Sequence, residues 1–157
     1  MKRIIAYYSL SGNTEEVTKN IAEKLGCDVL RIETAKAMPK SYAAQIVVGG
    51  GQVMMGVVPD IKPLDVDISD YDEIFVATPV WNGKCVPAIN TFLKIAPKEK
   101  VKGAIITSIS GDVDKCIVDL ETRLSSLKYT VSLFDKKQKN SSENQERIEN
   151  FIQSIED

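Results

Sequence analysis

Apolar positions along the chain alternate between short continuous runs and stripes that recur every three or four residues. Continuous runs are typical of buried strands, and the longer spacing is typical of amphipathic helices. The runs predict strands at residues 4–6, 28–33, 73–78, 102–108 and 129–134. The stripes predict helices at residues 17–25, 86–96, 113–127 and 148–155.

The stretch between the second and third strands has the least regular pattern. Residues from Tyr42 to Val48 favour a helix, but the run Gly49-Gly50-Gly51 weakens it by about 1 kcal/mol per glycine. We therefore expect a broken or irregular helix that ends at Pro59. The apolar residues after the glycines need burial, and we interpret Met54-Met55 as core filler.

The alternation of strands and helices predicts an α/β fold with a parallel sheet covered on both faces. Ligands of such sheets bind at the carboxyl ends of the strands. The loops after the first, third and fourth strands lie at that end, so we expect three segments to converge there: residues 9–14, 79–83 and 108–111.

Composition and charge narrow the function. The 157 residues predict one domain, 1–157, and the net charge of −2 gives no electrostatic case for binding nucleic acid or an anionic membrane. No stretch has the length of a membrane span, and the N-terminus enters a strand pattern without a signal-peptide core. A cytoplasmic location is the expectation.

Side-chain catalysis is not expected. The chain has no histidine, which excludes Ser-His and Cys-His pairs and histidine-ligated metals. Cys27, Cys85 and Cys116 are far apart and do not resemble a disulfide framework or a metal cluster. We therefore predict no catalytic residue and no metal, and expect a bound cofactor to supply the chemistry.

The loop after the first strand is the best candidate for binding that cofactor. Ser9-Leu10-Ser11-Gly12-Asn13-Thr14 consists mostly of hydroxyl, amide and glycine residues and precedes a helix. Backbone amides, hydroxyls and a helix N-terminus together can hold a phosphate. The same residue types also form ordinary turns and helix caps, so this alternative stays open.

Two segments give the chain a resemblance to a known family. Ser9–Thr14 resembles the phosphate loop of flavodoxins, and Thr78-Pro79-Val80-Trp81-Asn82-Gly83 resembles the loop that holds their flavin ring. The resemblance extends over essentially the whole chain. It implies a three-layer, doubly wound, five-stranded parallel sheet in the order 2-1-3-4-5 that binds FMN non-covalently.

The resemblance also implies roles for individual residues. The phosphate would be held by Ser9, Leu10, Ser11, Gly12, Asn13 and Thr14, with Gly12 allowing a close approach or a positive φ. The flavin ring would lie against Pro79, Val80, Trp81, Asn82 and Gly83, where a peptide of the Asn82–Gly83 region could flip toward it. The pyrimidine edge would meet Ser108, Ser110, Gly111 and Asp112.

Structural roles compete with several of these assignments. Trp81 could be a half-buried packing residue, and Asn82-Gly83 could be a plain turn. Asp112 could cap the following helix. We place Cys85 one turn into a helix and interpret it as a packing residue.

The partners follow from the resemblance and from charge. Classical flavodoxins resemble one another in an acidic collar around the flavin, whereas here lysines outnumber acids near the site: Lys36, Lys40, Lys84, Lys115, Lys136, Lys137 and Lys139 against Glu15, Glu16, Asp112, Asp114 and Asp135. We expect an electron carrier that works with redox protein partners. The alternative is an FMN-dependent reductase that takes hydride from NAD(P)H and reduces a quinone or similar small acceptor. A third hypothesis is a flavodoxin-like module that has lost FMN and serves regulation or assembly.

Overall fold

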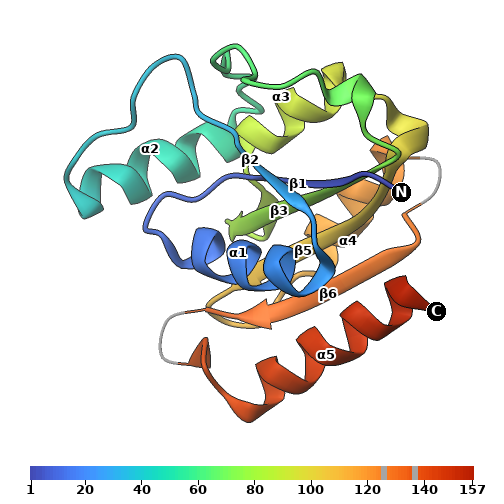
Figure 1. Cartoon of the computed structure of the whole chain (residues 1–157). Helices are drawn as coiled ribbons and strands as arrows, with labels where there is room; N and C mark the ends of the chain where they lie inside the picture. Colours follow the sequence, from blue (N-terminus) through green and yellow to red (C-terminus); the bar gives the residue numbers. More distant parts are fainter. Residues whose placement is uncertain (125–126, 136–137) are drawn as a thin grey trace.

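Five parallel strands form the central sheet of the part of the chain that the computed structural model describes, residues 1–124, 127–135 and 138–157 (Figure 1). Their order is β2-β1-β3-β5-β6. This differs from the expected 2-1-3-4-5 only because the short strand β4, which pairs with β3 alone, takes a number. The strands are β1 (Arg3–Tyr7), β2 (Asp28–Arg31), β3 (Glu73–Trp81), β4 (Lys84–Cys85), β5 (Val101–Ser108) and β6 (Tyr129–Phe134).

Helices cover both faces of the sheet, as the alternation predicts (Figure 1). One face packs against the apolar sides of α1 and α5, and the other against those of α3 and α4. The helices are α1 (Asn13–Leu25), α2 (Tyr42–Met54), α3 (Pro87–Ile95), α4 (Asp114–Arg123) and α5 (Ser142–Glu156), with short 3-10 turns at Ile68–Asp70 and Lys98–Lys100. Among the described residues, no helix combines the length and apolar character needed to cross a membrane.

Strand β3 lies at the centre of the core. Its residues from Ile74 to Ala77 have no exposed surface, and alternate residues belong to the two opposite apolar clusters. This two-sided burial explains the continuous apolar run in the sequence. The neighbouring strand supplies Gly103, because a Cβ there would lie 2.6 Å from a ring carbon of Phe75.

Helix α2 corrects the expectation of a broken helix. It runs without interruption through Gly49-Gly50-Gly51, and the following residues Met54 and Met55 are each 81% exposed, so their assignment to the core was wrong. Val57 and Val58 are exposed as well. The buried residues of the helix are Gly49 and Val53, and at Gly49 the backbone lies directly against the Trp81 ring.

The predicted loop at residues 79–83 is part of a β-hairpin. Strand β3 continues to Trp81, and β4 pairs back through Val80 with Cys85 and through Trp81 with Lys84. The two turn residues, Asn82 and Gly83, have φ angles of 50° and 77°. Two positive φ values in a two-residue turn define a type I′ hairpin, which matches the twist of the strands.

Cys85 forms a disulfide with Cys116, which corrects two expectations. Cys85 lies in β4, before α3 begins, and its Cα is 5.0 Å from that of Cys116 in α4. The pair is separated by 31 residues, so only the fold brings the two thiols together. Cys27 is the free cysteine.

The disulfide predicts the number of reactive thiols. In denaturant without a reductant, a thiol reagent should label one residue per chain, Cys27, and should label three after reduction. The double replacement Cys85→Ala/Cys116→Ala should lower the free energy of unfolding by about 4 kcal/mol through lost loop closure. Three labelled thiols before reduction would contradict the pairing; Cys27→Ala is the matched single control.

Candidate functional site

A cavity of about 450 Å³ opens at the carboxyl ends of the strands. It is bounded by the first loop with the start of α1, by the β3–β4 hairpin, by the ends of β5 and β6, and by one side of α2. Its lining residues are Leu10, Ser11, Thr14, Tyr42, Gln45, Ile46, Gly49, Gly50, Pro79, Val80, Trp81, Asn82, Thr107, Ser108, Ile109 and Asp135. The three predicted segments therefore do converge.

Not every predicted residue lines the cavity. Eight of those proposed for FMN do so: Leu10, Ser11, Thr14, Pro79, Val80, Trp81, Asn82 and Ser108. The others lie beside it in the same loops: Ser9, Gly12, Asn13, Gly83, Ser110, Gly111 and Asp112. Their roles toward a cofactor stay predictions, to be judged from the local geometry.

The first loop is ordered by its own polar groups. The buried Ser9 side chain accepts a hydrogen bond from the Gly12 amide at 3.1 Å, and the Asn13 amide nitrogen donates to the Ser11 hydroxyl at 3.2 Å. Gly12 has a φ of 94°, which is one of the two alternatives expected for this glycine, and α1 begins at the next residue. The first-turn amides of α1 have no acceptor within the helix, which suits an anion.

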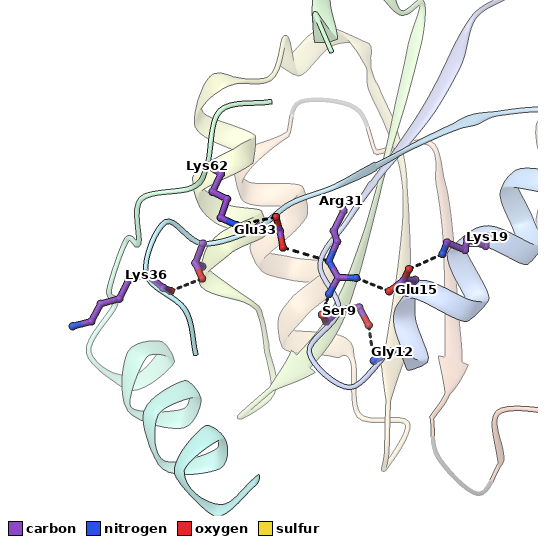
Figure 2. Close-up of polar contacts among 9 residues, drawn as sticks. Ser9, Gly12, Glu15, Lys19, Arg31, Glu33, Lys36 and Lys62 are labelled. Atoms are coloured by element: carbon purple, nitrogen blue, oxygen red, sulfur yellow. Dashed lines mark hydrogen bonds and ion pairs between the residues drawn. The ribbon is translucent and has the colours of Figure 1, made fainter. Parts of the chain in front are cut away.

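Arg31, at the end of β2, connects this loop to the neighbouring strand (Figure 2). Its guanidinium donates to the Ser9 carbonyl at 3.2 Å and forms an ion pair with Glu15 at 2.6 Å. Glu15 also pairs with Lys19 at 2.6 Å. The hydrogen bond from Lys19 and the charge of Arg31 lower the pKa of the Glu15 carboxyl, so it stays ionised beside the helix start.

A buried hydrogen bond joins α1 to β5 at the base of the cavity. The hydroxyls of Thr14 and Thr107 are 2.9 Å apart, and both side chains are almost fully buried. The bond fixes the start of α1 against the end of the neighbouring strand. Thr107 has no role in the sequence prediction, although its position beside Ser108 at a strand end could have suggested one.

Trp81 occupies the cavity wall and is also a packing residue. Its indole meets the Tyr8 ring edge-to-face, with centroids 5.6 Å apart, and contacts α2 at Gly49. Burial raises the pKa of the Tyr8 hydroxyl. At the base of the hairpin, the Thr78 hydroxyl donates to the Pro79 carbonyl and accepts from the Val86 amide. The two interpretations of Trp81 are thus compatible.

The third loop turns back on itself. The buried Ser108 hydroxyl accepts from the Gly111 amide at 3.1 Å, and the Ser110 hydroxyl accepts from the Asp112 amide at 3.3 Å. Gly111 has a φ of 80°, and a Cβ there would lie 2.8 Å from a ring carbon of Phe134. Asp112 does not cap α4, because that helix begins at Asp114 with Val113 at the cap position.

Helix α2 supplies most of the lining residues that the sequence prediction missed; the others are Thr107, Ile109 and Asp135. Tyr42, Gln45, Ile46, Gly49 and Gly50 form one wall of the cavity. The signal available in the sequence was the absence of any charged residue from position 41 to position 59. Such a stretch is unusual on a protein surface, and here much of it is exposed.

The structure describes some, but not all, of the lysines that the sequence predicts near the site. Lys139 forms an ion pair with Glu16 at 2.6 Å, which removes both from the count of free charges. Lys136 and Lys137 lie outside the described residues. None of the residues by which α2 lines the cavity carries a charge.

Comparison with known proteins supports the architecture. A family model described as Flavodoxin matches residues 2–155. A comparison with curated proteins found no match.

Solved structures share the fold at low identity. A flavoprotein from Lactobacillus acidophilus NCFM, solved in complex with FMN, is 18% identical with a TM-score of 0.71 over 96% of this chain and 97% of that one. A proposed flavoprotein from Bacteroides uniformis ATCC 8492 is 21% identical with a TM-score of 0.75, over 99% and 98%. A flavodoxin from the domain Archaea is 18% identical with a TM-score of 0.58, over 99% and 97%.

The threonine pair predicts a pattern of stabilities. Thr107→Val should lower the free energy of unfolding by about 1–3 kcal/mol, because the Thr14 hydroxyl is left buried without its partner. The double variant Thr14→Val/Thr107→Val should cost less than the sum of the two single changes. Chemical denaturation measures all three.

Thr18 in the same helix is the matched control. Its side chain is fully buried, and within the described residues its hydroxyl has no hydrogen-bond partner. Thr18→Val should therefore leave stability unchanged or raise it. Equal losses in all the single variants would mean that the Thr14–Thr107 bond has no special contribution.

Proposed function

The chain belongs to the flavodoxin family, and from this premise we propose that it binds FMN non-covalently in the cavity and carries electrons through it. FMN supplies the chemistry when bound, since its ring takes up and releases electrons. The protein's part is to hold, orient and shield the cofactor. This division agrees with the absence of histidine from the chain.

The observation that carries the proposal is the meeting of an anion-binding helix start with an aromatic wall in one cavity. At one end, Gly12 in a left-handed conformation opens α1, and Ser11 and Thr14 line the cavity. At the other end, the Trp81 indole lines the wall. A phosphate at the first and a planar ring at the second match the two ends of FMN.

Each loop has a proposed part in binding. Ser9 to Thr14 would hold the phosphate, with the Ser9 hydroxyl acting through the loop amide that it orients. Trp81 and the Asn82–Gly83 turn would meet the isoalloxazine ring; Asn82 is, within the described residues, the non-glycine position with a positive φ. Ser108 to Asp112 would offer backbone groups to the pyrimidine edge.

Electron carriage between redox proteins is the function we favour, and one observation supports a second candidate. The α2 wall of the cavity has no charge and includes the side chains of Tyr42 and Ile46. Such a wall suits a small planar acceptor such as a quinone, reduced through FMN at the expense of NAD(P)H. A carrier would instead need protein partners that reach the cavity mouth.

A cytoplasmic location remains the proposal from the sequence. The Cys85–Cys116 disulfide argues in the other direction, because structural disulfides persist mainly in oxidising compartments. Fractionation of the native source with thiol trapping would decide between the two.

The phosphate loop can be tested with two glycines at opposite ends of α1. Gly12 and Gly26 both have positive φ, 94° and 61°, and a Cβ at either would meet no atom within 4 Å. Both alanine variants should lose about 1–2 kcal/mol of stability through backbone strain. Gly12→Ala alone should raise the Kd for FMN by about tenfold or more.

Titration of the protein with FMN, followed by flavin absorbance and fluorescence, measures this difference. A wild-type chain that takes up no FMN would end the proposal. Equal FMN affinity in the Gly12→Ala and Gly26→Ala variants would contradict the assignment of the phosphate to this loop. It would not contradict FMN binding itself.

Carrier and reductase differ in two measurements on the FMN-loaded protein. A carrier should be reduced in two resolved one-electron steps during a reductive titration and should not oxidise NADH or NADPH. A reductase should oxidise one of these steadily when a quinone is present. Steady turnover with NAD(P)H would contradict the carrier assignment.

A further inference from the structure

Helix α2 touches the Trp81 ring through a backbone position. Gly49 is buried, and a Cβ built on it would lie 3.0 Å from Cε3 and 3.1 Å from Cζ3 of the indole. These distances are shorter than ordinary carbon contacts, so a side chain at position 49 requires the ring or the helix to shift by a few tenths of an ångström. The helix backbone and the indole thus pack directly.

Tyr8 limits the indole from another direction. Its ring is buried and stands at 86° to the indole, with centroids 5.6 Å apart. The hairpin fixes the Trp81 backbone through its pairing with Lys84. The side chain therefore has contacts with Tyr8 and Gly49, and Trp81 is also a lining residue of the cavity.

The two glycines that follow have different surroundings. Gly50 lines the cavity, and a Cβ there would meet no atom within 4 Å. Gly51 has equally open space but does not line the cavity. Within three successive helical glycines, contact with Trp81 is confined to the first.

We propose that Gly49 is a positioning residue that sets the plane of the Trp81 indole and, through it, how the flavin ring is seated. The effect on flavin rests on the proposed function; the effect on Trp81 does not. The proposal also explains why a helix interior keeps a residue that weakens it. The room that this glycine leaves is occupied by the indole.

Alanine variants of Gly49 and Gly51 test the proposal. Both substitutions should favour the helix to a similar extent, so differences between them report on Trp81. Because Trp81 is the single tryptophan of the chain, its fluorescence and near-ultraviolet circular dichroism report on this ring without FMN. Gly49→Ala should change both signals, and Gly51→Ala should change neither.

In the FMN-loaded state, Gly49→Ala should raise the Kd for FMN by about fivefold or more, while Gly51→Ala should match wild type. The Trp81→Phe background adds a test of coupling, because the smaller ring lacks the atoms that meet position 49. There, Gly49→Ala should have much less effect on the Kd.

The outcomes separate the two proposals. A wild-type chain that does not bind FMN ends the proposed function, and the tryptophan signals of the FMN-free variants still test the position of the ring. Identical tryptophan signals in the Gly49→Ala and Gly51→Ala variants would overturn the positioning role. So would an unchanged effect of Gly49→Ala on FMN affinity in the Trp81→Phe background.

Discussion

Burial of β3 on both faces is the constraint from which the site follows. Residues from Ile74 to Ala77 are inaccessible to solvent, and their side chains alternate between the two apolar clusters. Helices must therefore cover both faces of the sheet. Each crossover connection returns the chain to the end of the sheet where the parallel strands begin. The carboxyl ends of the strands are left together at the opposite edge, where the cavity lies.

Two different interactions hold the walls of that cavity. The first loop is fixed electrostatically and by hydrogen bonds, through Arg31 behind it and the Thr14–Thr107 contact beneath it. The Trp81 side chain is held by van der Waals packing between the Tyr8 ring and the backbone of α2. The polar first loop suits a charged group such as a phosphate, and the apolar Trp81 wall suits a planar ring.

Much of the fold could be predicted from the sequence because its signals are local. The period of apolar residues identified the five main strands, and Gly12 has the positive φ that was one of the two reasons expected for a glycine there. The first loop and the hairpin were correctly placed on one edge, since that follows from topology.

The failures share a different cause, which is that they depend on contacts between distant segments. The contact between Gly49 and the Trp81 indole joins residues 32 positions apart, and nothing near residue 49 reveals it. The helix itself continues through the three glycines, where propensity alone favours a break. Likewise, the pairing of Cys85 with Cys116 and the α2 wall of the cavity exist only in the folded chain.

The Cys85–Cys116 bond also closes a covalent ring that contains α3, β5 and the loop after β5. The hairpin and the start of α4 are the two ends of this ring, so they cannot move far apart. The Ser9–Thr14 loop and α2 lie outside it. The disulfide therefore limits how far the base of the hairpin and the start of α4 can separate, and it places no covalent limit on the first loop or on α2.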